Sequence, residues 1–237
     1  MLTYFIVDDT PTAVGILYTF VGEDAHHAIN VLRIKEGERF ALTDGRGYWA
    51  HVTAHGIGKR EMVCHVDEIG FDKPLTVQFT VIQALPKSDR MRESLELLTE
   101  GGVDRIVPWQ AERSIGKGDN VEKWKVTLRE ATKQSRRTYI PEITDVVDLS
   151  GVLAEIKQAD TAIAFHQESA QKLSDVFNTS AHRICIIIGP EGGLTGGEID
   201  ALRSAGAQIA LMGRPVLRTA HAGLAALSAV NALLGVW

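Results

Sequence analysis

The sequence has only two cysteines and no Cys-x-x-Cys spacing, which leaves little basis for a disulfide framework or a thiolate metal site. Cys64 and Cys185 lie far apart in strand-like segments, so we expect no metal and a reducing compartment. The start, MLTYFIVDD, has no basic region and reaches two acidic residues at once, which argues against a signal peptide. We therefore expect a cytoplasmic protein.

No lysine occurs between Lys172 and the C-terminus, so the glycine-rich stretch ICIIIGPEGGLTGGEID (residues 184–200) cannot be a Walker phosphate loop. It cannot be a dinucleotide fingerprint either, because too few residues follow it for further βαβ units. The stretch predicts a buried strand, a glycine loop and a helix that Thr195 and Glu198 begin with a capping box. Taken alone, the loop could also be a turn without a ligand.

A second loop of this kind follows. Residues 208–212 predict a short strand, residues 213–218 a loop, and the rest a small-residue helix. Loops at the carboxyl ends of neighbouring parallel strands form one crevice, the usual ligand position in such sheets. His221, Ser228 and Asn231 interrupt the apolar last helix, so we interpret it as buried or dimer-forming and not as a membrane span.

Neither sign of charge dominates the chain. The net charge of −5 argues against indiscriminate binding to nucleic acid. Residues 86–137 nevertheless carry 12 Lys and Arg against 9 Asp and Glu. This locally basic middle is compatible with a selective RNA surface, and equally with solvated helix faces.

The chain divides near the Gly-Pro-containing stretch at residues 70–75. Before it, a helix at residues 22–33 is set among short apolar segments typical of a small β-barrel or sandwich, at residues 3–7, 38–44, 48–56 and 61–70. After it, strands alternate with helices and predict a parallel α/β sheet. The strands are expected at residues 75–85, 103–109 and 161–166, and the helices at 87–102, with Ser88 or Asp89 as its cap, and at 120–137.

Polar residues on the long second helix are candidates for chemistry. Glu130, Gln134 and Arg137 are spaced i, i+4, i+7 and would share one face, although such a stripe could be simple surface. Arg136 and Arg137 precede a tyrosine and a proline turn, where guanidinium groups could meet RNA phosphates or stack on bases.

Other candidates are isolated. His26 and His27 are adjacent and face different directions, unlike a metal-binding i, i+4 pair. Arg33 is expected to point to solvent. Lys87 directly follows the first strand of the second domain, near the carboxyl edge of the sheet.

Several motifs, in their order and spacing, resemble the RsmE family of the SPOUT superfamily of methyltransferases. They are HHAINVLRIKEGE, ALPKSDRMRESLELLTEGGVDRIVPW, ERS (residues 112–114), EATKQSRR, PEI, IGPEGGLTGGE and GRPVLRT. The resemblance implies methylation of N3 of one uridine in 16S ribosomal RNA, on the assembled 30S subunit, by a homodimer. A SPOUT enzyme acting on another RNA site, a non-catalytic ribosome- or RNA-binding protein, and a phosphate-transferring enzyme remain alternatives.

The resemblance also implies the architecture and the cofactor. Residues 1–72 would form a PUA-like β-barrel, and residues 73–237 a SPOUT domain whose C-terminal part, about 163–237, holds a trefoil knot and the cofactor site. Knots are too rare for the sequence pattern itself to predict one. The cofactor would be S-adenosylmethionine, which has no phosphate and needs no Walker lysine.

Site residues follow from the matching motifs. Arg218 and Arg137 would stabilise the uridine anion, and Glu130 and Gln134 would orient the base. RNA would contact His27, Arg33, Lys87, Arg113, Arg136 and Arg137. The cofactor would contact Phe165, His166, Gly189, Pro190, Glu191, Gly192, Gly193, Leu211, Met212, Gly213, Val216, Leu217 and Arg218.

One motif departs from the family. The family commonly has Arg-Thr-Glu-Thr-Ala where this chain has Arg218-Thr219-Ala220-His221-Ala222. Any role of that glutamate cannot be carried over, and the sequence does not identify the general base.

Overall fold

The computed structural model describes residues 2–87, 90–116, 118 and 120–236, so the predicted caps Ser88 and Asp89 lie outside the described residues. The chain forms two compact units. The first contains residues 1–74 together with 129–140, and the second contains residues 75–128 and 141–237. The predicted boundary at residue 72 stays a prediction.

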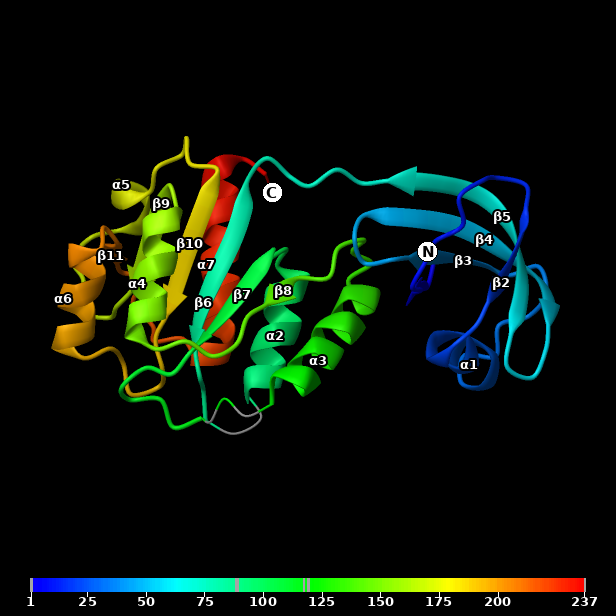
Figure 1. Cartoon of the computed structure of the whole chain (residues 1–237). Helices are drawn as coiled ribbons and strands as arrows, with labels where there is room; N and C mark the ends of the chain where they lie inside the picture. The colour runs from blue at the N-terminus through cyan, green and yellow to red at the C-terminus, as the bar shows by residue number, and fades with distance from the viewer. Residues whose placement is uncertain (1, 88–89, 117, 119, 237) are drawn as a thin grey trace. The chain divides into compact units, whose positions relative to one another are not determined.

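The first unit is built on a five-stranded sheet with the order β1-β3-β4-β5-β2 (Figure 1). Strands β1 and β3 are parallel, and the other neighbours are antiparallel. Strands β1 and β2 form the two edges, so the described strands make an open, curled sheet and not a closed barrel. The elements are β1 (Tyr4–Ile6), β2 (Leu17–Phe20), α1 (Glu23–Asn30), β3 (Arg39–Thr43), β4 (Tyr48–Ile57) and β5 (Met62–Phe71).

Apolar side chains from alternate strand positions form the core of this unit. The rings of Phe5, Phe20 and Phe40 lie 5.4–5.7 Å apart in tilted or edge-on contacts. The segments at residues 3–7, 38–44, 48–56 and 61–70 are confirmed as strands. Strand β2 was not predicted, because it has only four residues and its sequence, LYTF, does not alternate apolar with polar side chains.

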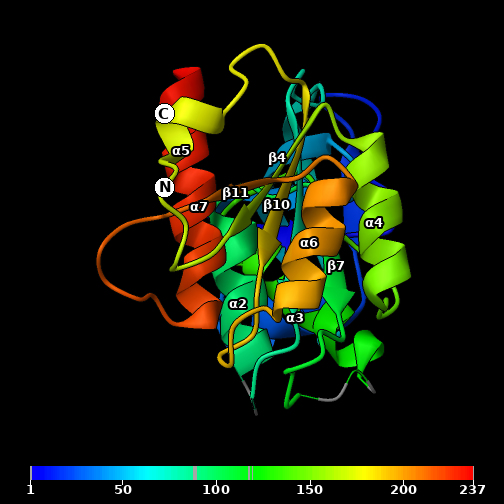
Figure 2. The same ribbon diagram turned by 90° about the vertical axis from the view of Figure 1, so that its left-hand side faces the viewer.

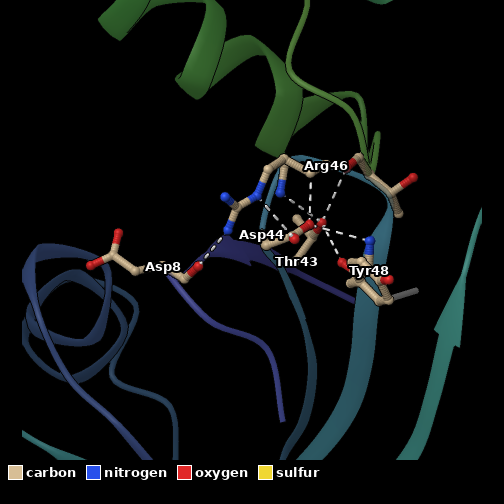
Figure 3. Close-up of polar contacts among 7 residues, drawn as sticks. Asp8, Thr43, Asp44, Arg46 and Tyr48 are labelled. Atoms are coloured by element: carbon tan, nitrogen blue, oxygen red, sulfur yellow. Dashed lines mark hydrogen bonds and ion pairs between the residues drawn. The ribbon is translucent and has the colours of Figure 1, made fainter. Parts of the chain in front are cut away.

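The turn between β3 and β4 is held by side chains (Figure 3). Asp44 accepts hydrogen bonds from the amides of Arg46 and Tyr48, and the Thr43 hydroxyl donates to the carbonyl of Tyr48. The Arg46 guanidinium donates to the carbonyl of Asp8. The chain returns to this turn much later, since the amide of Gly47 donates to the carbonyl of Thr138.

The second unit is built on a six-stranded sheet with the order β11-β9-β10-β6-β7-β8, in which every pair is parallel. The predicted parallel α/β sheet is therefore confirmed. Its elements are β6 (Gln78–Ala84), α2 (Arg90–Glu100), β7 (Arg105–Trp109), the first part of α3 (Val121–Gln134), β8 (Glu142–Ile143), α4 (Leu149–Gln158), β9 (Thr161–Phe165), α5 (Leu173–Val176), β10 (Arg183–Ile188), α6 (Gly196–Ser204), β11 (Gln208–Ala210) and α7 (Thr219–Leu234). The rest of α3, from residue 129, belongs to the first unit.

Helices cover both faces of this sheet (Figure 2). Helices α4 and α6 pack on one face through Val152, Ile156 and Leu202, in a core shared with strand residues such as Ile187. Helices α2 and α7 lie together on the opposite face. Strand β10 is buried between the two layers, which explains its unbroken run of apolar residues from Ile184 to Ile188.

Three elements of this unit were not predicted, namely α4, α5 and β8. The predicted long helix also ends early, because α3 stops at Gln134 and the chain turns at Arg136. Helix α7 ends at Leu234, and no described helix is both long and apolar enough to cross a membrane. Cys64 and Cys185 are buried, and burial raises the pKa of each thiol to about 12.

Candidate active site

The carboxyl ends of the parallel strands meet at one edge of the sheet, and a pocket of about 480 Å³ opens there. Its walls come from the loops that follow β9, β10 and β11 and from the first residues of α2 and α7. All thirteen residues predicted to bind a cofactor line this pocket. The sequence prediction therefore brought the right loops together, while the binding role of each residue stays a prediction.

The glycine loop after β10 is fixed at its far end by the first turn of α6. The Thr195 hydroxyl accepts the amide of Glu198, and the Glu198 carboxylate accepts the amide of Thr195, which confirms the predicted capping box. The buried Glu198 also accepts the amide of Glu112, and the carboxylate of Glu112 accepts the hydroxyl of Thr195. The segment after β7 is thereby joined to the glycine loop.

Glu191 ties the middle of the glycine loop to the neighbouring strand. Its Oε1 accepts the amide of Lys87 at 3.2 Å and the guanidinium of Arg90 at 3.3 Å. Lys87 follows β6 and Arg90 begins α2, so two loops at the carboxyl edge are linked through one carboxylate oxygen. Arg90 itself lines the pocket and is 43% exposed.

Arg113 also contacts the glycine loop. Its guanidinium donates to the carbonyl of Gly192 at 3.0 Å. A Cβ on Gly192 would lie 3.1 Å from the Cβ of Arg113, so the two backbones approach closely. Arg113 therefore has a structural contact beside the role in RNA binding that the sequence suggested.

His166 has a defined hydrogen-bonding role within the pocket. Its Nδ1 accepts the amide of Glu168 at 3.3 Å. In the neutral imidazole that keeps this hydrogen bond, the proton is on Nε2, which is then a donor. Among the pocket-lining residues that the structure describes, Glu191 is the one carboxylate.

The loop at residues 213–218 is exposed along its length although it contains apolar side chains. Val216 is 77% exposed and Leu217 is 41% exposed. The pocket is therefore apolar on the side of this loop, and Arg214 and Arg218 add positive charge to it.

The predicted catalytic stripe is only partly formed. Glu130 and Gln134 lie on α3, but Arg137 lies beyond the helix end, so the expected i, i+7 relationship is wrong. Glu130 forms an ion pair of 2.7 Å with Lys133. These three residues belong to the first unit, whereas the pocket is formed by the second.

The predicted RNA contacts are divided between the units in the same way. Lys87 and Arg113 lie at the pocket edge of the second unit. His27, Arg33, Arg136 and Arg137 belong to the first unit, and the first three of them are exposed. Of the residues that the structure describes, no group of three or more His, Cys, Asp and Glu side chains is arranged to hold a metal ion.

Sequence reasoning missed part of the pocket wall. Gln167, Arg214, Pro215 and Thr219 adjoin predicted residues and could have been found by extending the two loops. Arg90 could not, because its contact with Glu191 joins residues 101 positions apart. The full set of missed residues is Arg90, Gln167, Ile188, Leu194, Arg214, Pro215, Thr219 and Ala222.

Ala220 and His221, which depart from the family motif, both make defined contacts in the structure. Ala220 is fully buried at the start of α7. His221 points its Nε2 at the Oε1 of Glu93 on α2, at 2.9 Å. A carboxylate from another helix, that of Glu93, therefore contacts this motif.

Comparison with known proteins agrees with this architecture. Residues 73–231 match the protein-family model described as an RNA methyltransferase domain, and residues 22–67 match an RNA methyltransferase PUA domain. The ribosomal RNA small subunit methyltransferase E of Mycobacterium bovis is 33% identical, over 98% of this chain and 92% of its own. The Bacillus subtilis protein of the same name is 29% identical, over 98% and 96% of the two chains.

Solved structures show the same similarity over the whole length. Ribosomal RNA small subunit methyltransferase E from Neisseria gonorrhoeae, bound to S-adenosyl methionine, has a TM-score of 0.87 at 26% identity and covers 98% of each chain. A Legionella pneumophila protein in complex with the cofactor SAM has a TM-score of 0.85 at 25% identity, over 98% of this chain and 96% of its own. The chain therefore belongs to the ribosomal RNA small subunit methyltransferase E (RsmE) family of RNA methyltransferases.

Proposed function

We propose that this protein transfers a methyl group from S-adenosylmethionine to N3 of a specific uridine in 16S ribosomal RNA, on the assembled 30S subunit in the cytoplasm. The observation that carries the proposal is that the glycine loop and residues 211–218 line the same pocket. The names of the relatives support an RNA substrate, and the bound ligands of two solved relatives support the cofactor.

The pocket fits S-adenosylmethionine in size and in chemistry. Its volume of about 480 Å³ lies in the range usual for small-molecule sites. A Cβ on Gly193 would meet no atom within 4 Å, so space lies open directly above the backbone of the glycine loop. Backbone groups there and apolar side chains such as Leu194 and Leu211 suit an adenosine, while the guanidinium of Arg214 suits a carboxylate.

When bound, the cofactor supplies an electrophilic methyl group. Uridine N3 then has to lose a weakly acidic imide proton, and negative charge spreads to O2 and O4. Arg218, which lines the pocket, is our first candidate to stabilise that charge. Arg137 is the second candidate, and Glu130 and Gln134 are the candidates for orienting the base. The N3 atom lies on the Watson–Crick edge, so the target has to be unpaired or flipped out.

The candidate for the proton acceptor follows from the hydrogen bonds of His166 and Glu191, the histidine and the carboxylate among the described residues that line the pocket. In its neutral form His166 has a hydrogen-bond donor at Nε2. It therefore suits donation to a uridine oxygen better than acceptance of the N3 proton. Glu191 has Oε1 occupied by two donors and can accept only through Oε2. Glu191 is therefore our first candidate for the general base.

The proposal includes two further features of the family resemblance. The C-terminal part of the chain, about 163–237, would pass through a trefoil knot around the pocket. The exposed apolar side chains of Val216, Leu217 and Leu233 would be covered in a homodimer. Light scattering that finds only a species of 25.9 kDa, the mass of one chain, would refute the dimer.

The test is methyl transfer from labelled S-adenosylmethionine to small ribosomal subunits that lack the modification, followed by nucleoside mass spectrometry. Formation of 3-methyluridine is the expected result. Another methylated nucleoside would mean a different RNA site, and subunit binding without transfer would mean an adaptor. Thermal protection by nucleotides, but not by S-adenosylmethionine, would instead favour phosphate transfer.

A further inference from the structure

The start of α2 contacts both of the loop regions that line the pocket. Arg90, in the first turn, donates to Glu191 of the glycine loop, and Glu93 accepts from His221 in the first turn of α7. Arg90 and Glu93 are spaced i, i+3 and therefore share one face of α2. Helix α7 begins directly after the loop at residues 213–218. One face of α2 thus joins the glycine loop to the helix that follows the second loop.

This part of α2 is itself fixed to the sheet. Ser94, next to Glu93, is fully buried, and its hydroxyl donates to the side chain of Gln83 at 3.0 Å. Gln83 lies on β6 and is also fully buried. A buried polar group that loses its partner is costly, so this hydrogen bond opposes any shift of α2 along the sheet. Glu93 is therefore carried by a helix whose position on β6 is fixed.

The start of α7 has little stabilisation of its own. Arg218 is its N-cap residue, and within the described chain the Arg218 side chain makes no capping hydrogen bond. The first turn contains no acidic residue that could interact with the positive end of the helix. Helix α6, which follows the glycine loop, has a complete capping box instead. A helix start without these features leaves its first amides poorly satisfied.

Glu93 supplies an acidic partner from outside the helix. A carboxylate only accepts hydrogen bonds, so the Nε2 of His221 carries a proton and donates to the Oε1 of Glu93 at 2.9 Å. The backbone amides of His221 and Ala222 both donate to the carbonyl of Arg218, at 2.9 and 3.0 Å. Holding the His221 side chain therefore keeps the first hydrogen bonds of α7 closed, and these fix the backbone of Arg218.

An ion pair of the surface without consequence is the alternative explanation. The side chains of His221 and Glu93 are 46% and 49% exposed, and pairs of this kind add little to global stability. The position of this pair argues for a functional role, because it joins a fixed helix to an uncapped helix start. Arg218, directly before that start, lines the pocket. A small local contribution is sufficient where the local structure is weak.

We infer that Glu93 and His221 are positioning residues, which fix the first turn of α7 and thereby the place of Arg218 on the pocket wall. The inference rests on the proposed function in that it takes Arg218 to stabilise charge during methyl transfer. A charged group is most effective when it is already in place before the charge develops. Glu93 and His221 act through the backbone of Arg218 and not through contact with the uridine.

The test follows the start of α7 and the reaction separately. E93A and H221A remove the contact, and H221Q is the conservative variant, because the amide of Gln keeps a hydrogen-bond donor at this position. Alanine is the better helix former in both places, so helix propensity cannot explain a looser helix start. E96A is the control, since Glu96 pairs within α2, with Arg92 at 2.8 Å.

Hydrogen exchange is measured by mass spectrometry on peptides that span residues 211–224. The amides of the first turn of α7 should exchange about two- to fivefold faster in E93A and H221A than in the wild type. The kcat for methyl transfer should fall by a similar factor of about two to five, while the affinity for S-adenosylmethionine changes less than about twofold.

Two further comparisons show whether the pair acts through Arg218. In the R218A background, E93A should lower kcat no further, because both changes then affect the same group. H221Q should keep most of the rate, and E96A should match the wild type in exchange, rate and affinity.

Four results would overturn the inference. They are unchanged exchange at the start of α7 in E93A and H221A, faster exchange with kcat as in the wild type, an equal loss of rate in E96A, and additive effects of E93A and R218A. Methyl transfer by the wild type is measured first and tests the proposed function by itself. A wild type that transfers no methyl group would refute that function and the role of Arg218 together. An active wild type beside any of the four results would refute the positioning role alone.

Discussion

The carboxylate of Asp24, at the start of α1, lies 2.7 Å from the Nζ of Lys133 on α3, and both side chains are 10% exposed. Asp24 also accepts the amide of Ile6 and pairs with Arg129 at 3.3 Å. One buried carboxylate thus holds together strand β1, helix α1 and the second half of α3. These contacts join α3 to the N-terminal stretch of the first unit, which also contains residues 129–140.

D24N should lower the free energy of unfolding by about 3 kcal/mol, because it leaves two cations near a site from which water is largely excluded. The measurement is urea denaturation followed by circular dichroism. D200N is the control, since Asp200 is 80% exposed and lies 3.8 Å from Arg203. Equal effects of D24N and D200N would show that the Asp24 network does not stabilise the unit.

R90Q and E191Q should each weaken binding of S-adenosylmethionine, about three- to tenfold, because the glycine loop loses its ion pair with the start of α2. The charge-reversed double variant R90E/E191R should recover part of the affinity, as measured by isothermal titration calorimetry. R92Q, on the same helix but outside the pocket, is the control. A harmful R90Q beside a harmless E191Q would instead mean that Arg90 contacts the ligand directly.

R218A should reduce kcat by about 10²–10³-fold while the affinity for S-adenosylmethionine stays nearly unchanged, if Arg218 stabilises charge that develops only during transfer. Single-turnover methylation and equilibrium binding give the two quantities. A parallel loss of both would assign Arg218 to cofactor binding. R214A is the matched comparison, because Arg214 lines the same pocket.

The stability of the second unit should depend on Asp160 in acid. Hydrogen bonds from the side chain and amide of Arg183 and the amide of His182 lower the pKa of Asp160 from 3.8 to about 2. Because the folded-state pKa is depressed, the stabilisation is complete above pH 4 and is lost as the pH falls towards 2. D160N should therefore lower the melting temperature at pH 5 and have little effect at pH 2. A difference that does not change with pH would contradict this assignment.

The elements that position the pocket could be read from the sequence, because their signals are local. A run of isoleucines predicted β10, and Thr195 with Glu198 predicted the start of α6. Helix α4 was missed although its signals are also local, with Asp148 as the cap and apolar residues at positions 149, 152, 153 and 156.

The relationships that could not be predicted from the sequence depend on backbone geometry or on contacts between residues far apart in the sequence. The predicted helical stripe from Glu130 to Arg137 is not formed, because α3 ends at Gln134 and Arg136 takes the left-handed conformation. No glycine or proline marks this helix end in the sequence. The anchoring of Glu191 by Arg90 and the buried network of Asp24 join residues about a hundred positions apart. Periodicity within one segment cannot reveal such pairs.

The first unit is built from two separate stretches of the chain, and this affects how the protein folds during synthesis. Residues 1–74 leave the ribosome well before residues 129–140, which supply Arg129 and Lys133 to Asp24 and Thr138 to Thr43 and Asp72. Until then the carboxylate of Asp24 lacks both of its cations. The N-terminal unit therefore reaches its final form only after much of the second unit's chain has been made, and a fragment cut at residue 74 would not be a self-sufficient domain.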